Sequence, residues 1–185
     1  MKVVILAGGL GSRMDERSKI QSKALSDIGG HPILWHLLNY YFHFGFDEFV
    51  IALGHMANSV RNYFEWAGYS SSASEVDGTS QQWHNSKIKV NLVDTGLHTE
   101  NGGRIKRLAK FLDNGTFMLT WCDGLSDVNL NCLLDFHKSH GLLATLTAVH
   151  PPGRFGRLVL LGNRVTQFNE KTISSEEWIN GAFHA

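Results

Sequence analysis

The feature that most constrains the fold of this chain is its first strand-like segment, residues 2–7 (KVVILA). The apolar residues of this segment are continuous and largely β-branched, and they do not alternate with polar ones. This pattern is typical of a short strand that is buried on both faces in a parallel sheet. Parallel strands need a long crossover between them, which is usually a helix.

Further along the chain, strand-like and helix-like patterns alternate several times. Strands are expected at residues 48–53, 87–93, 116–121, 143–149, 157–161 and 165–169, the last two as a hairpin. Helices are expected at residues 33–44, 57–66, 104–112 and 129–140. The alternation predicts an α/β fold: a Rossmann-like, doubly wound, mostly parallel sheet with helices on both faces. Ligands of such sheets bind beyond the carboxyl ends of the strands.

One segment interrupts this pattern. Residues 69–86 (YSSSASEVDGTSQQWHNS) are polar, rich in serine and poor in aliphatic side chains, so we expect a long mobile loop there. The segment is too short to link two domains, and the sequence contains no internal repeat. With 185 residues, the chain is long enough for a sizeable core. We therefore expect a single domain over residues 1–185.

The composition is that of an ordinary soluble globular protein, with 43% hydrophobic and 18% charged residues. Seventeen Lys and Arg balance seventeen Asp and Glu, which argues against general nucleic-acid binding because that needs a basic surface. The apolar runs are too short for a membrane span or a signal peptide. Cys122 and Cys132 make neither a disulfide framework nor a zinc site. A reduced, cytoplasmic compartment is the simplest expectation.

A glycine-rich turn follows the first strand, at the edge where ligands are expected. Gly8, Gly9 and Gly11 remove side chains where backbone N–H groups can face outward, which favours an anion-binding concavity. Arg13 adds a fork of donors suited to phosphate oxygens. The dinucleotide fingerprint needs a glycine at Met14, and the P-loop motif is absent. The spacing alone is equally compatible with a phosphate loop and with a tight turn beside a solvated arginine.

Residues 6–14 (LAGGLGSRM) resemble the signature loop of the sugar-1-phosphate nucleotidyltransferases. The resemblance continues in order over nearly the whole chain. Its further segments are IGGHPILWH (28–36), LVDTG (92–96), GGRIKRLA (102–109), DFHKSHG (135–141), ATLTAVHPPGRFG (144–156), FNEK (168–171) and INGAF (179–183). This set closely resembles one branch of the family, the glucose-1-phosphate cytidylyltransferases, and ILWH, GGRIKR and PPGRFG are more specific than the loop alone.

The resemblance implies an enzyme that joins a nucleoside triphosphate to a hexose 1-phosphate and releases pyrophosphate. In the cytidylyltransferase branch the substrates are CTP and glucose 1-phosphate, and the product, CDP-glucose, serves nucleotide-sugar and polysaccharide biosynthesis. The resemblance also implies Mg²⁺ as cofactor and a homo-oligomer in the full-length family, and we expect no nucleic-acid or membrane partner. Two alternatives stay open: the same reaction with another base or sugar phosphate, and a non-catalytic relative that only binds a nucleotide or nucleotide sugar.

The resemblance also implies roles for individual residues of this chain. Catalytic roles are implied for Arg13, Lys23 and Asp123, with Asp123 as the Mg²⁺ ligand. Nucleotide contacts are implied for Leu6, Ala7, Gly8, Gly9, Gly11, Ser12, Arg13, Lys23, Gly102 and Gly103. Sugar-phosphate contacts are implied for Glu170, Lys171, Asn180 and Gly181. In isolation, Asp123 would be interpreted as a turn cap, and Glu170 with Lys171 as a solvated charge pair.

The chain departs from the family in three places. Residues 21–25 read QSKAL where the family has K-P-K-P/A-M, so Gln21 and Ser22 replace a lysine and a proline. Residues 69–86 do not match well, which leaves the choice of base open. The family continues beyond residues 179–183 and carries a second metal-binding aspartate there. The resemblance therefore implies that this chain is shortened at its C-terminus.

Overall fold

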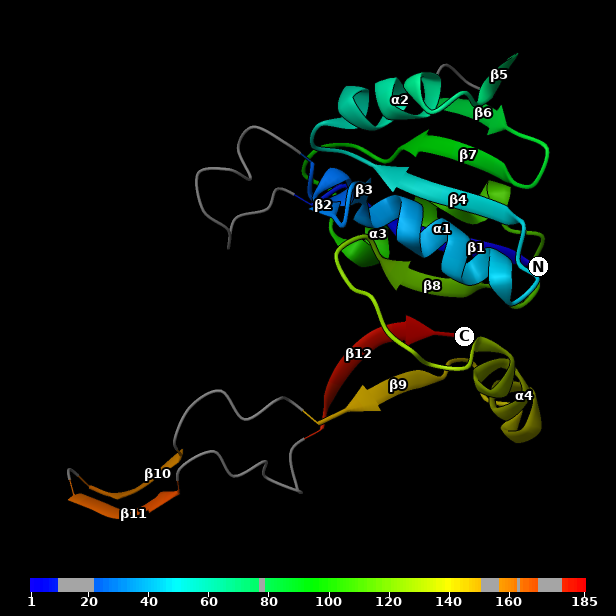
Figure 1. Cartoon of the computed structure of the whole chain (residues 1–185). Helices are drawn as coiled ribbons and strands as arrows, with labels where there is room; N and C mark the ends of the chain where they lie inside the picture. The colour runs from blue at the N-terminus through cyan, green and yellow to red at the C-terminus, as the bar shows by residue number, and fades with distance from the viewer. Residues whose placement is uncertain (10–21, 77–78, 151–156, 163, 170–177) are drawn as a thin grey trace. The chain divides into compact units, whose positions relative to one another are not determined.

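The computed structural model describes residues 1–9, 22–76, 79–150, 157–162, 164–169 and 178–185. These residues form two compact units (Figure 1). The first consists of Met1–Thr145 with Ala182–Ala185, and the second of Leu146–Gly181. The larger first unit contains the central sheet and is described first.

Four parallel strands form the centre of the first unit's sheet. They are β7 (Lys89–Asp94), β4 (Glu48–Leu53), β1 (Lys2–Leu6) and β8 (Met118–Trp121), in that spatial order. Beyond β7 lie β6 (Ser80–His84) and β5 (Ser70–Val76), and beyond β8 lies β12 (Ile179–His184), all antiparallel to their neighbours. Four neighbouring parallel strands with antiparallel strands outside them confirm the predicted mostly parallel sheet.

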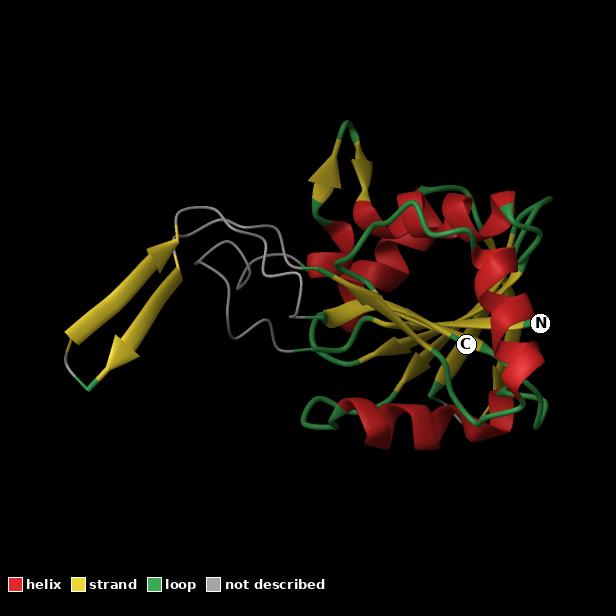
Figure 2. Cartoon of the chain, turned by 90° about the horizontal axis from the view of Figure 1, so that it is seen from below, coloured by secondary structure: helices red, strands yellow, loops and turns green. Residues whose placement is uncertain are grey.

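Helices cover both faces of this sheet (Figure 2). On one face, Val3 and Ile5 share a core with α1 (Ile33–His43), α2 (Ala57–Trp66) and α4 (Leu130–His140). On the other face, Val4 and Leu6 pack in a second core with α3 (Asn101–Leu108) and the short 3₁₀ helix η3 (Ala109–Phe111). Successive residues of β1 point to opposite faces. Both faces are covered, and this explains why its sequence is continuously apolar.

The connection from β1 to α1 ends in a short ordered stretch. A 3₁₀ helix, η2 (Lys23–Leu25), is followed by the two-residue strands β2 (Asp27–Ile28) and β3 (His31–Pro32), which pair with each other. The turn between these strands is made by Gly29 and Gly30, whose φ angles are +63° and +89°. Glycine adopts this left-handed conformation without steric cost, so the predicted break before α1 is sharp.

Residues 69–86 are a correction to the sequence analysis, because the structure has the hairpin β5–β6 where a loop was expected. Strand β6 is held by backbone pairing with β7, in which Gln82 faces Asn91 and Trp83 faces Val90. Within β6, Ser80 and Trp83 are buried while Gln82 and His84 lie more exposed. Such a polar outer hairpin depends on main-chain hydrogen bonds more than on apolar burial, and its side chains therefore gave little strand signal.

The second unit consists of strands only in its described part. Strand β9 (Leu146–Val149) lies beside the first residues of β12, and β10 (Arg157–Leu161) pairs with β11 (Arg164–Asn169). The hairpin at 157–169 was predicted, and β9 is three residues shorter than the expected strand 143–149. Gly181 packs closely on β9: a Cβ there would lie 2.9 Å from Val149 Cγ1.

Candidate active site

The four parallel strands end side by side, and each continues into a segment that contains glycine. Hydrogen bonds hold these segments in register just beyond the strands: Ala7 N donates to Ala52 O (2.9 Å), Thr95 N to Leu53 O (2.9 Å) and Cys122 N to Leu6 O (3.2 Å). We call this end of the sheet the carboxyl edge. It is the edge where the sequence predicted a ligand site.

A buried arginine from α3 connects three of these segments. The Arg104 guanidinium donates to Leu53 O (3.0 Å), Gly8 O (2.7 Å), Gly96 O (3.0 Å) and Thr95 Oγ1 (2.6 Å). Only 3% of its surface is exposed. Burial lowers the pKa of Arg104 from its usual value, and Coulomb attraction to nearby carboxylates partly opposes this shift. Because its ordinary pKa is so high, the guanidinium stays charged.

Two glycines leave the space that this guanidinium occupies. A Cβ on Gly8 would lie 2.2 Å from Arg104 Nη1, and one on Gly54 would lie 2.6 Å from the same atom. Gly8 is therefore buried, and its missing side chain makes room for Arg104. Gly9 is exposed, and a Cβ there would have no atom within 4 Å.

Lys23 and Asp123, two residues with implied catalytic roles, meet at this edge. Lys23 Nζ lies 3.3 Å from Asp123 Oδ2, although the residues are 100 positions apart in the chain. Lys23 opens η2, and Asp123 follows β8. Their side chains are 27% and 47% exposed, so a bound anion or cation can reach both. The neighbouring Cys122 is a buried thiol whose pKa burial raises to about 12, and it therefore stays protonated.

The other residues with implied site roles lie on α3 or β12, or outside the described residues. Gly102 and Gly103 lie in the first turn of α3, which corrects the expected turn before a helix that begins at Arg104. Asn180 and Gly181 lie on β12, in the residues that belong to the second unit. Five implied site residues lie outside the described residues: Gly11, Ser12, Arg13, Glu170 and Lys171.

For a divalent cation, the described residues offer Asp123. Its carboxylate is an exposed, hard oxygen donor at a strand end, and Mg²⁺ is commonly held by one or two carboxylates together with substrate phosphates. Within the described ranges, no three histidine, cysteine, aspartate or glutamate side chains are grouped as an all-protein metal site would require. The residues present thus fit a metal that is shared with a substrate phosphate.

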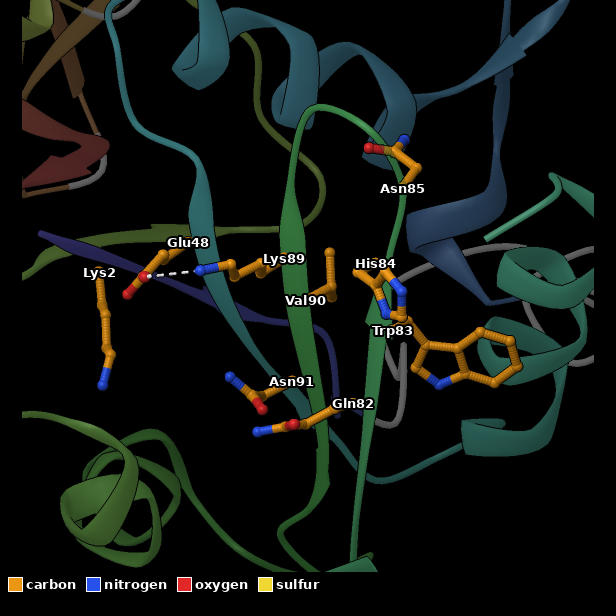
Figure 3. A pocket seen from close by; sticks show the side chains of 9 residues that line it. All are labelled: Lys2, Glu48, Gln82, Trp83, His84, Asn85, Lys89, Val90 and Asn91. Carbon is orange, nitrogen blue, oxygen red and sulfur yellow. Dashed lines mark ion pairs between the residues drawn. The ribbon is translucent and has the colours of Figure 1, made fainter. Parts of the chain in front are cut away.

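A hollow at the opposite end of the same strands is distinct from this site. It has a volume of about 430 Å³ and is lined by residues that include Lys2, Glu48 and Lys89, the first residues of β1, β4 and β7 (Figure 3). We call this end the amino edge. A strand of five residues spans about 16 Å, so the hollow lies roughly that far from the carboxyl edge. None of the residues that line it was implied in the site by the sequence.

Sequence reasoning missed the role of Arg104, although the segment GGRIKRLA that contains it was among the resembling segments. An arginine inside a helical pattern is normally interpreted as a solvated residue. Its burial is set by acceptors at Gly8 and Leu53, which are far away in the sequence, and at Gly96, eight residues before it. In the sequence, only the missing side chains of Gly8 and Gly54 indicated the space that the Arg104 side chain occupies.

Comparisons with known proteins show which family this sequence resembles. Residues 3–80 match the MobA-like NTP transferase domain. The chain is 40% identical over 191 residues to the glucose-1-phosphate cytidylyltransferase of Salmonella typhimurium, covering 99% of this chain and 74% of that protein. It is 38% identical to the probable glucose-1-phosphate cytidylyltransferase of Bacillus subtilis, covering 99% of this chain and 73% of that protein.

Solved structures show the same fold. HddC from Yersinia pseudotuberculosis superposes with a TM-score of 0.67 at 21% sequence identity, covering 99% of this chain and 75% of that one. Among the helices in the described parts of this chain, none combines the length and the apolar character needed to cross a bilayer. The family expected from the sequence is therefore confirmed: this chain belongs to the sugar-1-phosphate nucleotidyltransferases, an enzyme family with a Rossmann-like, mostly parallel sheet.

Proposed function

We propose that this protein transfers a cytidylyl group from CTP to glucose 1-phosphate, giving CDP-glucose and pyrophosphate. The names of the Salmonella and Bacillus relatives support the choice of CTP and glucose 1-phosphate. The observation that carries the proposal is the Lys23–Asp123 pair at the carboxyl edge, the same edge at which the exposed Gly9 follows β1. It brings an ammonium group and a potential metal ligand together where a triphosphate would have to bind.

The chemistry needs positioning and charge neutralisation more than a protein nucleophile. A phosphate oxygen of the sugar 1-phosphate attacks the α-phosphorus of CTP. The new phosphorus–oxygen bond forms as the bond from the α-phosphorus to the oxygen that bridges to the β-phosphate breaks, and pyrophosphate leaves. Both substrates are anions and repel each other. The protein's task is therefore to hold them in line and to balance their charge.

We assign the cationic part of this task to Arg13 and Lys23. Lys23 approaches the reacting phosphates, and Arg13 takes the triphosphate and the leaving pyrophosphate. Asp123 would hold Mg²⁺, which supplies charge neutralisation at the phosphate oxygens. Without substrate, the Asp123 carboxylate pairs with the Lys23 ammonium group at 3.3 Å.

The remaining assignments follow the family pattern. The backbone at Leu6, Ala7, Gly8, Gly9, Gly11 and Ser12 lies against the nucleotide, with Gly102 and Gly103 near its base and ribose. The sugar phosphate is contacted by Glu170, Lys171, Asn180 and Gly181. Homo-oligomer formation and a place in cytoplasmic polysaccharide biosynthesis belong to the same proposal.

The test is a pyrophosphate-release assay with a matrix of five nucleotides (CTP, UTP, GTP, ATP and dTTP) and three sugars (glucose, mannose and heptose 1-phosphates), with Mg²⁺ present. We expect the highest kcat/KM for CTP with glucose 1-phosphate. A different best pair would replace the substrate assignment and keep the reaction. Nucleotide binding by calorimetry without pyrophosphate release from any pair would instead identify a binding protein and overturn the proposed activity.

A further inference from the structure

We propose that Arg104 is a positioning residue of the nucleotide site, which fixes the Gly8–Gly9 turn by binding the Gly8 carbonyl from inside the protein. This inference rests on the proposed function, because it takes that turn to be the surface that receives the nucleotide. It assigns Arg104 no contact with substrate. Its effect on the reaction passes through the backbone that it holds.

The contacts of the guanidinium are nearly all with the main chain beyond strand ends. It binds the carbonyls of Gly8 after β1, Leu53 at the end of β4, and Gly96 and Leu97 after β7, the last at 3.3 Å. Gly8 O also accepts a hydrogen bond from His55 N at 3.3 Å. The shortest of the guanidinium–carbonyl contacts is the one to Gly8, at 2.7 Å, so the phosphate-loop backbone is the most closely held of these segments.

The guanidinium fills the space between the segments that follow β1 and β4. Gly8 and Gly54 contact the guanidinium so closely that a Cβ on either would overlap it. The planar fork of arginine reaches several acceptors in fixed directions, whereas a lysine ammonium at the same site would reach fewer of them. The position of Gly8, and with it that of the next residue Gly9, is therefore set by α3, through an arginine 96 residues after Gly8.

The charge on Arg104 strengthens these contacts. A buried cation is costly unless its donors are satisfied, and hydrogen bonds to charged groups are stronger than neutral ones. Here the donors are satisfied by four carbonyls and one hydroxyl. Asp94 and Glu100 favour the charged form through Coulomb attraction. Removing the guanidinium would take its hydrogen bond from Gly8 O and leave that carbonyl with the longer contact from His55 N at 3.3 Å, so the Gly8–Gly9 segment would be held less firmly.

Arg107 provides a matched control on the same helix. Its Nη1 donates to Thr95 O (2.5 Å) and Thr99 Oγ1 (2.7 Å), so it braces the segment after β7. The contacts of Arg107 do not include Gly8 or Leu53. Arg107→Lys therefore weakens only the contacts between α3 and the segment that follows β7. Arg104→Lys weakens contacts with that segment as well, and it also removes the hydrogen bond to the Gly8 carbonyl.

The experiment compares Arg104→Lys with Arg107→Lys in the full chain, at a temperature where circular dichroism shows both folded. The first readout needs no ligand: ¹⁵N-glycine NMR follows the Gly9 amide. The second is the affinity for CTP by calorimetry, with KM for CTP and for glucose 1-phosphate measured separately. In Arg104→Lys we expect a shifted Gly9 amide and a CTP Kd and KM raised about tenfold, as loss of charged hydrogen bonds predicts. The KM for glucose 1-phosphate and all values for Arg107→Lys should stay within about twofold.

Thr95→Val keeps the test decisive if Arg104→Lys does not fold. It removes one acceptor of the guanidinium, Thr95 Oγ1 at 2.6 Å, and Thr95→Ser retains the hydroxyl as its control. We expect a smaller change of the same kind, about threefold in CTP affinity, in Thr95→Val alone.

A Gly9 amide that is unchanged in both Arg104→Lys and Thr95→Val, with CTP affinity equal to that of the wild type, would overturn the proposal and leave Arg104 as a brace of the fold. If the wild type bound no nucleoside triphosphate at all, the proposed function would fail. The ligand-free Gly9 signal would still decide whether Arg104 fixes the turn.

Discussion

The two edges of one sheet make different uses of charge. At the carboxyl edge, Arg104 is buried among neutral carbonyls, the pair Lys23–Asp123 is partly exposed, and Gly9 is exposed. At the amino edge, Lys2, Lys89 and Glu48 line the hollow shown in Figure 3. Lys89 pairs there with Glu48 at 3.8 Å, and Lys2 pairs with Asp113, outside the hollow's lining, at 2.8 Å. The same parallel strands begin at one edge and end at the other.

The difference shows that a hollow with charged walls is not sufficient evidence for an active site. The charges at the amino edge are cross-strand or surface pairs that already neutralise each other, and Lys89 and Asp113 are largely exposed. At the carboxyl edge, a buried guanidinium binds the backbone that follows three strands, and the neighbouring Gly9 leaves its own backbone exposed. Substitutions at matched positions of the two edges therefore test whether only the carboxyl edge carries chemistry.

The largest effect is expected for Asp123→Asn. The amide keeps the size of the side chain but loses the charge that a divalent cation requires, so kcat/KM should fall at least about 100-fold, in line with loss of one charged transition-state interaction. Thermal unfolding should change little, because this side chain is half exposed. Asp127→Asn, on the same segment and also exposed, is the control. Equal activity of the two variants would remove Asp123 from the site.

Lys23→Met comes next, compared with Lys89→Met at the amino edge. Each lysine is one partner of an ion pair with a carboxylate. Loss of Lys23 should lower kcat/KM about 10- to 100-fold, since one preorganised cation at the phosphates is lost. Loss of Lys89 should leave kcat/KM unchanged. Steady-state kinetics in low and physiological salt measures both, and equal losses in the two variants would argue against a difference between the edges.

Gly8→Ala tests the packing at the carboxyl edge. The new Cβ would meet the Arg104 guanidinium, and overpacking of this kind costs about 1–3 kcal/mol of unfolding free energy. Gly9→Ala, one residue later, meets no atom within 4 Å and should be close to neutral for stability. Urea unfolding of both variants provides the comparison. Similar losses in the two would show that the guanidinium yields to the added methyl group.

The free energy of unfolding should also depend on pH in the alkaline range, through Cys122 at the carboxyl edge. Burial raises the pKa of this thiol from 9.0 to about 12, so the folded state holds its proton more tightly than the unfolded chain does. Its contribution is complete below pH 9 and decreases between pH 9 and 12, by at most about 1.4 kcal/mol per pH unit. Cys122→Ala should reduce the decrease in unfolding free energy between pH 9 and 10, and the decrease that remains there belongs to other groups, such as the tyrosines whose pKa values burial also raises.

Cys132 is the control for this pH dependence, because it is exposed. Cys132→Ala should leave the slope between pH 9 and 10 unchanged. A wild-type slope that persists in Cys122→Ala would assign the alkaline loss to other groups.

The strands that carry both edges were predictable from the sequence, and the connections that complete the carboxyl edge were less so. The runs KVVILA and EFVIAL are continuous and apolar because helices cover both faces, and the helix at 57–66 was predicted to the residue. The hairpin at 70–84 was not predicted, because its pairing with β7 depends on backbone groups that every sequence has.

The residues of the candidate site were likewise predictable only in part. Lys23 and Asp123 were reached through the family resemblance, and in the structure they lie 3.3 Å apart. Local patterns alone gave Asp123 an alternative interpretation as a turn cap, since an aspartate followed by glycine is common in turns. Arg104 could not be found in this way. Its role depends on three strand ends that converge only in the folded sheet.

The smallest effect is expected for Glu48→Gln at the amino edge. Glu48 and Lys89 are cross-strand partners in the β4–β7 register, but Lys89 is 75% exposed and the pair is 3.8 Å apart. A solvated pair of this kind contributes about 0–1 kcal/mol, so the unfolding free energy should fall by no more than about 0.5 kcal/mol. Turnover should not change. A fall in kcat/KM for Glu48→Gln, with stability intact, would mean that the amino edge acts on the reaction through β4, whose other end Arg104 holds at Leu53.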